Sequence, residues 1–321
     1  RAGAVMSLAP KGKDVVEHLL PLLADPYPQV RAAVIQVLDQ EGIDQDWRKK
    51  LAHEIYIPEG PFVMGSDPAE DPESRDDEQP TRVVTLAPYY IAKYPITNAD
   101  WQRYVDDQPD AFVPADWPDG VCPEGREDHP ARYLSWYAVR DYAEWAGMRM
   151  PTEAEWEKAA RGPMMVGIQE ADDEEMKVYS TPHGRVYPWG DQWKRSLCNI
   201  AEGAQGDTTP VGVYGERSES PYGCADMAGN VWEWVADWYR WNYYAIGPLS
   251  NPPGPETGTE RVLRGGSFAD LAADARCARR QHLYPSATLM TFGGRLAVPP
   301  SPPRGSLLSD ILSYEMEEER D

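Results

Sequence analysis

Hydrophobic and polar positions alternate most clearly near the middle of the chain, directly after a Gly-Asn pair that favours a turn. The run 231–235 reads Val-Trp-Glu-Trp-Val, and its period of two places Trp232 and Trp234 on one face and Glu233 on the other. Two neighbouring indoles bury a large apolar area, so we expect this strand at the centre of the core. A second strand is predicted at 261–264, before a Gly-Gly pair that suits a bulge or a close backbone approach.

Other stretches predict further strands and three helices. A strand and turn are expected at 57–66, and a pair of strands at 83–93 around a proline. Helices are predicted at 97–105, where a threonine provides the N-cap, and at 135–147. A third helix at 152–162 begins with the capping box Thr-Glu-Ala-Glu and ends at a glycine.

The two ends of the chain differ from its middle. Residues 13–41 show two helical stripes separated by an Asp-Pro break, a pattern similar to one HEAT repeat. A lone repeat leaves a face uncovered, so we expect it to pack on the main domain or, as we favour, to follow further repeats ahead of Arg1. The expected organisation is a HEAT-like helical segment at 1–54, a main domain at 55–298 and a Pro-rich, acidic tail at 299–321.

The formal net charge of −22 argues against nucleic acid and against a membrane as partners, because phosphate binding requires clustered Lys and Arg. Part of the acidity lies in 67–79, which we predict to be a surface loop. The cysteines lack metal-binding spacing and are interpreted as isolated thiols or at most two disulfides. They are Cys122, Cys198, Cys224 and Cys277. The chain begins at Arg1, so a removed signal peptide and a longer parent protein both stay open, with the cytoplasm slightly favoured.

Several motifs occur together in one order along the chain. They are MPTEAEWEKAARG at 150–162, YPWG at 187–190, GNVWEW at 229–234 and RVLRGGSF at 261–268. Together they resemble the formylglycine-generating-enzyme (sulfatase-modifying factor) family over roughly three quarters of the chain. The resemblance implies an α+β, loop-rich variant of the C-type-lectin-like fold. Because that family is functionally mixed, it implies less about activity.

The catalytic residues of the family are the main departure. The oxidase members of the family hold copper with two cysteines just after Gly-Gly-Ser, and here Cys277 is the sole cysteine in that region. The histidines do not have the spacing of the iron ligands of the family's sulfoxide synthases. We therefore expect no enzymatic activity and no required cofactor. One enzymatic alternative stays open, in which Asp270, Asp274 and His282 form a non-standard metal or acid–base site for an oxidoreductase.

The resemblance also implies a possible structural calcium ion at the turn before the central strand. Its ligands would be three backbone carbonyls and one carboxylate, which are oxygen donors that suit a hard cation. They belong to Ala228, Gly229, Val231 and Glu233. The alternative for Glu233 is an ion pair with a buried arginine such as Arg264 or Arg276.

The segment 268–295 contains a scaffold of Arg, Cys-Ala, Pro and Gly residues with small variable-looking clusters between them. This spacing resembles the variable region of lectin-fold proteins diversified by retroelements, where such positions form a solvent-facing binding surface. The candidate binding residues are Ala269, Asp270, Leu271, Asp274, Gln281, His282, Leu283, Tyr284, Ala287, Leu289, Met290 and Thr291. We predict a non-enzymatic module that binds an unknown protein or other macromolecule. An inactive sensor or scaffold domain of a larger signalling or defence protein is the alternative.

Overall fold

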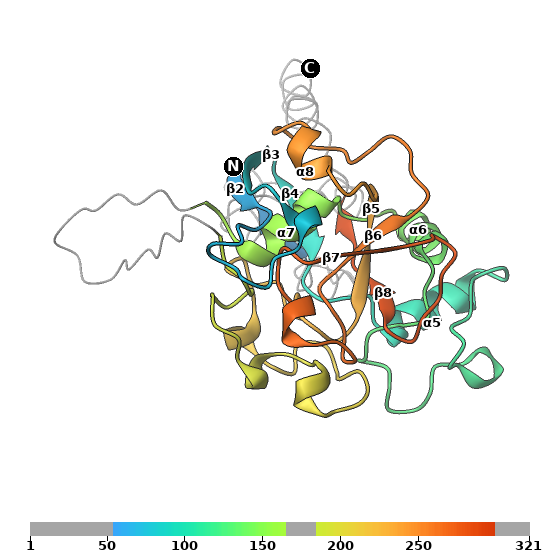
Figure 1. Cartoon of the computed structure of the whole chain (residues 1–321). Coiled ribbons are helices and arrows are strands. Elements are labelled where there is room, and N and C mark those ends of the chain that lie inside the picture. Colours follow the sequence, from blue (N-terminus) through green and yellow to red (C-terminus); the bar gives the residue numbers. More distant parts are fainter. Residues whose placement is uncertain (1–53, 165–183, 299–321) are drawn as a thin grey trace, which may run out of the picture. The chain divides into compact units, whose positions relative to one another are not determined.

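The computed structural model describes residues 54–164 and 184–298, and the cartoon in Figure 1 follows the chain through them. Within these ranges, Ile57–Val298 forms one compact unit. The predicted HEAT-like segment and the predicted tail lie outside the described residues. None of the described helices is long and apolar enough to cross a membrane.

The predicted central strand is β5 (Trp232–Trp238), in a four-stranded sheet of order β7-β6-β5-β8. Its neighbours are β6 (Arg261–Arg264) and β8 (Phe292–Gly294), and β7 (Arg280–Leu283) forms the edge beyond β6. β5 pairs antiparallel with β6 and parallel with β8. The predictions of strands at 231–235 and 261–264 are therefore confirmed, and β5 continues three residues beyond the alternating run.

The remaining strands build smaller sheets. The first described strand is β1 (Glu54–Ile57), and β2 (Gly60–Met64) pairs antiparallel with β3 (Arg82–Leu86). β4 (Tyr89–Ala92) pairs antiparallel with β9 (Ala297–Val298). The expected pair of strands around Pro88 exists, but its two members join different sheets.

The three predicted helices are confirmed. They are α5 (Asn98–Asp107), α6 (Trp136–Trp145) and α7 (Glu153–Arg161). A further one-turn helix, α8 (Tyr243–Ile246), follows β5 in the chain. Thr97 and Thr152 close the capping boxes of α5 and α7, which satisfies backbone N–H groups that a helix start otherwise leaves free. Six 3-10 turns occupy the loops of residues 54–164 and 184–298: η4 Asp76–Glu78, η5 Pro118–Gly120, η6 Arg195–Leu197, η7 Ala201–Gly203, η8 Glu216–Ser218 and η9 Ala272–Asp274.

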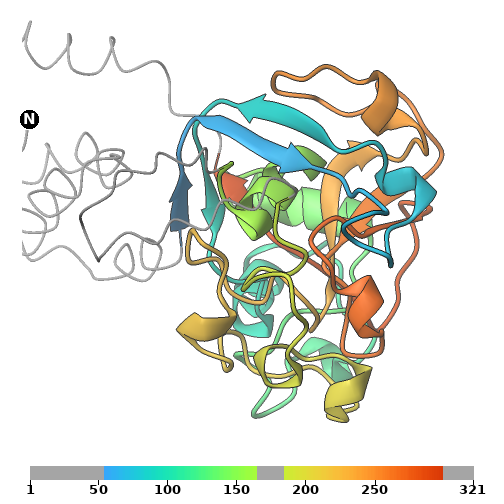
Figure 2. The same ribbon diagram turned by 60° about the vertical axis from the view of Figure 1, so that its left-hand side comes forward.

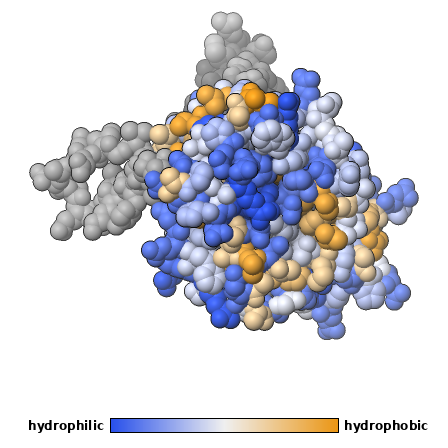
Figure 3. All heavy atoms as spheres, in the orientation of Figure 1, coloured by the Kyte–Doolittle hydropathy of each residue, from blue (hydrophilic) through white to orange (hydrophobic). Residues whose placement is uncertain are grey.

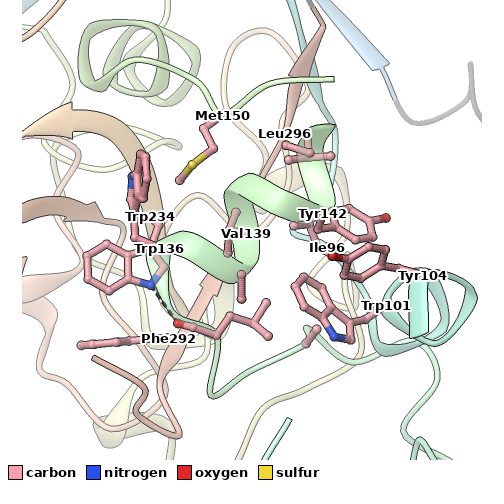
Figure 4. Close-up of a cluster of buried hydrophobic side chains, with 14 of the residues drawn as sticks. Ile96, Trp101, Tyr104, Trp136, Val139, Tyr142, Met150, Trp234, Phe292 and Leu296 are labelled. Atoms are coloured by element: carbon pink, nitrogen blue, oxygen red, sulfur yellow. Dashed lines mark hydrogen bonds between the residues drawn. The ribbon is translucent and has the colours of Figure 1, made fainter. Parts of the chain in front are cut away.

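Aromatic side chains from α5, α6 and β5 form the principal hydrophobic cluster (Figure 4). Trp101 of α5 stacks on Tyr142 of α6 with ring centroids 5.0 Å apart. Trp234 of β5 is fully buried, and its indole N–H donates to the Leu134 carbonyl at 2.8 Å. Each indole thus contributes apolar area to the core while its polar group keeps a hydrogen-bond partner.

Helix α7 lies on the other side of the sheet and is held to β2 by buried polar contacts. In Figure 2 the blue and cyan strands β2 and β3 lie beside this green helix. Lys158 donates to the carbonyls of Pro58 and Gly60, and Glu157 accepts from the Gly65 N–H at 2.7 Å. As a result both faces of β5 are covered, which explains why Glu233 is as deeply buried as its tryptophan neighbours.

Candidate functional site

The candidate binding residues lie along η9, β7 and the connection from β7 to β8, on the face turned to the viewer in Figure 1. None of the twelve is buried. The large hydrophobic ones among them are prominent, with Leu271 58%, Tyr284 62%, Leu289 49% and Met290 42% exposed. Figure 3 shows hydrophobic spots separated by hydrophilic atoms on this face. We call these twelve residues the recognition surface; their role in binding stays a prediction.

The frame beneath the recognition surface is made of buried ion pairs. Arg280 of β7 makes two hydrogen bonds to Glu153, at 2.7 and 3.0 Å. Arg264 of β6 donates to Glu153 at 2.9 Å and to Glu157 at 2.6 Å. Burial by itself would raise the pKa of Glu153, but Arg280 and Arg264 outweigh it and lower the pKa. All four charges are therefore paired inside the protein, which fixes β6 and β7 to α7.

A second buried pair corrects the prediction for segment 67–79. Arg276 donates to Glu78 at 2.7 and 2.8 Å and to Asp71 at 2.6 Å. Glu78 is completely buried and Asp71 nearly so. The acidic segment is thus partly an inner support for the recognition surface, because two of its carboxylates neutralise a buried guanidinium.

The three residues of the alternative oxidoreductase site are not brought together. Asp270 accepts from the Trp232 indole at 2.8 Å, and Asp274 pairs with an arginine on either side. His282 instead hydrogen-bonds Glu260 at 2.8 Å, with its ring stacked on Tyr239 at 3.7 Å between centroids. The acid–base pair of His282 with an aspartate is therefore wrong. The sequence signal for its true partner is weak, since Glu260 precedes β6 by one residue and meets His282 only through β6–β7 pairing.

The thiols are not arranged for chemistry either. All four cysteines are free, and only Cys122 is partly exposed. Burial raises the pKa of Cys277 to about 12 and that of Cys224 to about 11, so both stay protonated at neutral pH. In the part of the chain that the structure describes, no group of three or more His, Cys, Asp or Glu side chains could hold a metal ion.

The carboxylate expected to bind calcium is already engaged. Glu233 accepts from Arg295 at 2.8 and 2.9 Å and from the Trp156 indole at 2.6 Å. Its buried arginine partner is thus Arg295, and neither Arg264 nor Arg276, which pair with other acids. Both carboxylate oxygens of Glu233 thus already accept hydrogen bonds from Arg295, and its role as a calcium ligand stays a prediction. A calcium site on the carbonyls of Ala228, Gly229 and Val231 stays a prediction.

This geometry agrees with the comparisons with known proteins. The family model for the sulfatase-modifying factor enzyme 1-like domain matches residues 39–299. The chain belongs to this family. Among solved structures, PvdO from Pseudomonas aeruginosa covers 76% of this chain with 93% of its own, at 26% identity and a TM-score of 0.59. Treponema denticola variable protein 1 covers 77% of this chain with 95% of its own, at 21% identity and a TM-score of 0.56, which confirms the C-type-lectin-like fold.

The curated relatives that match this family domain are named as a kinase, a formylglycine-generating enzyme and an oxygenase. The kinase pkn1 of Chlamydia caviae is 33% identical over 76% of this chain, and the chain spans 37% of that kinase's length. The formylglycine-generating enzyme of Thermomonospora curvata is 36% identical over 70% of this chain and 84% of its own. Hercynine oxygenase of Mycolicibacterium smegmatis is 32% identical over 76% of this chain and 60% of its own. These names point to an enzyme and overturn the expectation that the chain is none.

Proposed function

We propose that the recognition surface of this family domain docks a protein or peptide, as a ligand or as a substrate. The observation that supports it is the contrast between large exposed side chains and the buried ion pairs directly beneath them. Exposed Leu, Met and Tyr side chains that are grouped on a rigid support are typical of contact surfaces. Met290 and Tyr284 also suit varied partners, one by flexibility and the other by its combined apolar and polar character.

The setting we propose is a domain within a larger protein that carries a second activity. The likeness to part of the pkn1 kinase supports this setting, because the matching region is about a third of that relative. In such a protein the recognition surface would select the partner or the substrate. Such a role is compatible with catalysis by the domain itself.

A second candidate function is an oxidation of the kind that the names formylglycine-generating enzyme and hercynine oxygenase indicate. The identities of 36% and 32% with those relatives favour it. The test is oxygen consumption by the purified full chain, loaded in turn with copper and iron, in the presence of a cysteine-containing peptide. Consumption above that of the free metal would support the oxidation, and the absence of any increase with both metals would refute it for that substrate class.

The main proposal is tested by selecting binders to the full chain from a random peptide library. We expect the double substitution Tyr284→Ala and Leu289→Ala to weaken the selected peptides at least about ten-fold, because contact aromatics at interfaces are often worth more than 1 kcal/mol each. The matched control is Trp241→Ala with Leu249→Ala, since these residues are 64% and 56% exposed outside the recognition surface. Equal weakening by both pairs, or by neither, would count against the recognition surface.

A further inference from the structure

Arg261, at the start of β6, is half-buried and has surroundings unlike those of the buried arginines. Its guanidinium carbon lies 3.8 Å from the ring centroid of Trp136 and 3.5 Å from that of Trp238. The planar group is therefore held between two indoles, an arrangement that restricts its motion.

The hydrogen bonding of Arg261 is incomplete. One Nη donates to the Ala236 carbonyl, and Nε is buried without an acceptor among the described residues. No carboxylate lies within ion-pair distance of it in those residues, whereas Arg264, Arg276, Arg280 and Arg295 each pair with one. The charge of Asp237 raises the pKa of Arg261, but Asp237 is itself buried, and burial raises the pKa of this carboxyl to about 7. Arg261 is thus a cation whose charge the fold leaves mostly uncompensated.

The pKa of Arg261 is lowered by burial to about 10, which still leaves the side chain charged at neutral pH. A second cation is close by: Arg140 of α6 lies over the rings of Trp136 and Tyr137, at 5.7 and 5.4 Å. Arg140 is paired with Asp141 at 2.6 Å, so of these two cations only Arg261 has no carboxylate partner among the described residues. A bound anion would supply the counter-charge that the Arg261 guanidinium lacks.

The Arg261 clamp adjoins the recognition surface. Arg261 pairs in register with Leu283 of β7, and the backbone N–H of Trp136 donates to the Pro285 carbonyl at 3.0 Å. Tyr284 lies between these two contacts in the chain and is exposed, as is Tyr137 of α6. A peptide seated on Leu283 and Tyr284 would therefore pass the clamp.

We infer that Arg261, held between Trp136 and Trp238, forms a carboxylate-binding subsite for a peptide docked on the recognition surface. The inference rests on the proposed function and adds the chemistry of the ligand to it. Because Nε is buried, the two Nη groups would donate the hydrogen bonds to the carboxylate, a planar pair of donors that lysine cannot reproduce. The carboxylate belongs to an acidic side chain or to a free C-terminus.

The test uses three small probes on the full chain, with binding measured by calorimetry. N-acetyl-tyrosine carries a terminal carboxylate, N-acetyl-glutamic acid α-amide carries a side-chain carboxylate, and N-acetyl-tyrosinamide carries none. We expect the terminal or the side-chain carboxylate probe to bind about ten-fold more tightly than the neutral probe, since hydrogen bonds to charged groups exceed neutral ones. Whichever acid binds more tightly identifies the source of the carboxylate. Equal binding of all three, or no binding of either acid, would overturn the subsite.

Substitutions of Arg261 test whether the preference for the acid probes depends on this residue. Arg261→Gln should remove the preference for the acid, and Arg261→Lys should reduce it to about two-fold because the charge stays but the planar fork is lost. The unfolding midpoint of each variant checks that the fold persists. An unchanged preference in folded Arg261→Gln would refute the assignment, and if that variant fails to fold the comparison of probes on the unaltered chain still decides.

The outcome also separates this inference from the proposed function. Peptides that depend on Tyr284 and Leu289 but show no acid preference would remove the subsite alone. An acid preference that depends on Arg261, with peptides indifferent to Tyr284 and Leu289, would remove the recognition surface alone.

Discussion

Two parts of the segment after β6 follow opposite rules of burial. Between η9 and β7, Arg276 and Arg280 are 1% and 0% exposed, whereas Leu271 and Tyr284 on either side are more than half exposed. Charged residues are therefore inside and large apolar ones outside. Burying a guanidinium is tolerated only with a well-placed carboxylate, so the inner part accepts few alternatives. The outer part has no such requirement, and its side chains are free to serve binding.

The largest effect on stability is expected when one buried charge of the inner part is removed. Arg280→Ala should lower the free energy of unfolding by about 3–5 kcal/mol, because Glu153 loses both of its hydrogen bonds to Arg280 inside the protein. Chemical denaturation followed by circular dichroism measures it. The control is Arg75→Ala, whose ion pair with Asp274 is largely exposed on the arginine side and should cost less than about 1 kcal/mol. Similar losses for the two variants would contradict the inner frame.

A second, smaller effect concerns pH. Asp237 accepts from the Glu153 N–H at 2.8 Å, and burial, followed by the charge of Glu153, raises its pKa to about 7. A carboxyl with a raised pKa binds its proton more tightly in the folded state. It therefore stabilises the fold at low pH, and this stabilisation falls as the pH rises from about 4 to about 7.

The matched variant for this prediction is Asp237→Asn, which cannot titrate. Between about pH 4 and pH 7, the free energy of unfolding of the native chain should fall relative to the variant, by at most about 1.4 kcal/mol per pH unit. Denaturation curves at four pH values measure the difference, from which the shared contributions of Asp226 and His129 cancel. Parallel curves for the two proteins would show that Asp237 does not titrate in this window.

The smallest effect is expected on the recognition surface. Leu271→Ser and Leu289→Ser should each change the free energy of unfolding by no more than about 0.5 kcal/mol, because Leu271 is 58% and Leu289 49% exposed to solvent. The same leucine-to-serine change at buried Leu263 of β6 serves as the contrast and should destabilise strongly. Thermal unfolding of the three variants is sufficient. A loss above about 2 kcal/mol at Leu271 or Leu289 would place that residue in the frame.

Much of the fold could be predicted from local patterns. The strand at 261–264 and the capping box at Thr152 depend on short-range periodicity and on side chains within one helical turn, and both are confirmed. The family motifs predicted the lectin-like fold for the same reason, since they mark turns and core positions in a set order. The expectation of no enzymatic activity was drawn from missing cysteines and was overturned by relatives that bear enzyme names.

Sequence by itself determined where the three longer helices and the strands at 231–235 and 261–264 lie, because hydrophobic period, caps and turns act between neighbours in the chain. Only the tertiary structure decided which charge meets which. Glu233 meets Arg295, 62 residues away, and Arg276 meets Glu78 at a separation of 198. Any of several arginines could neutralise a given carboxylate, and their choice depends on how strands and helices pack. For the same reason the clamp around Arg261, built from α6 and β5, was visible only in the folded protein.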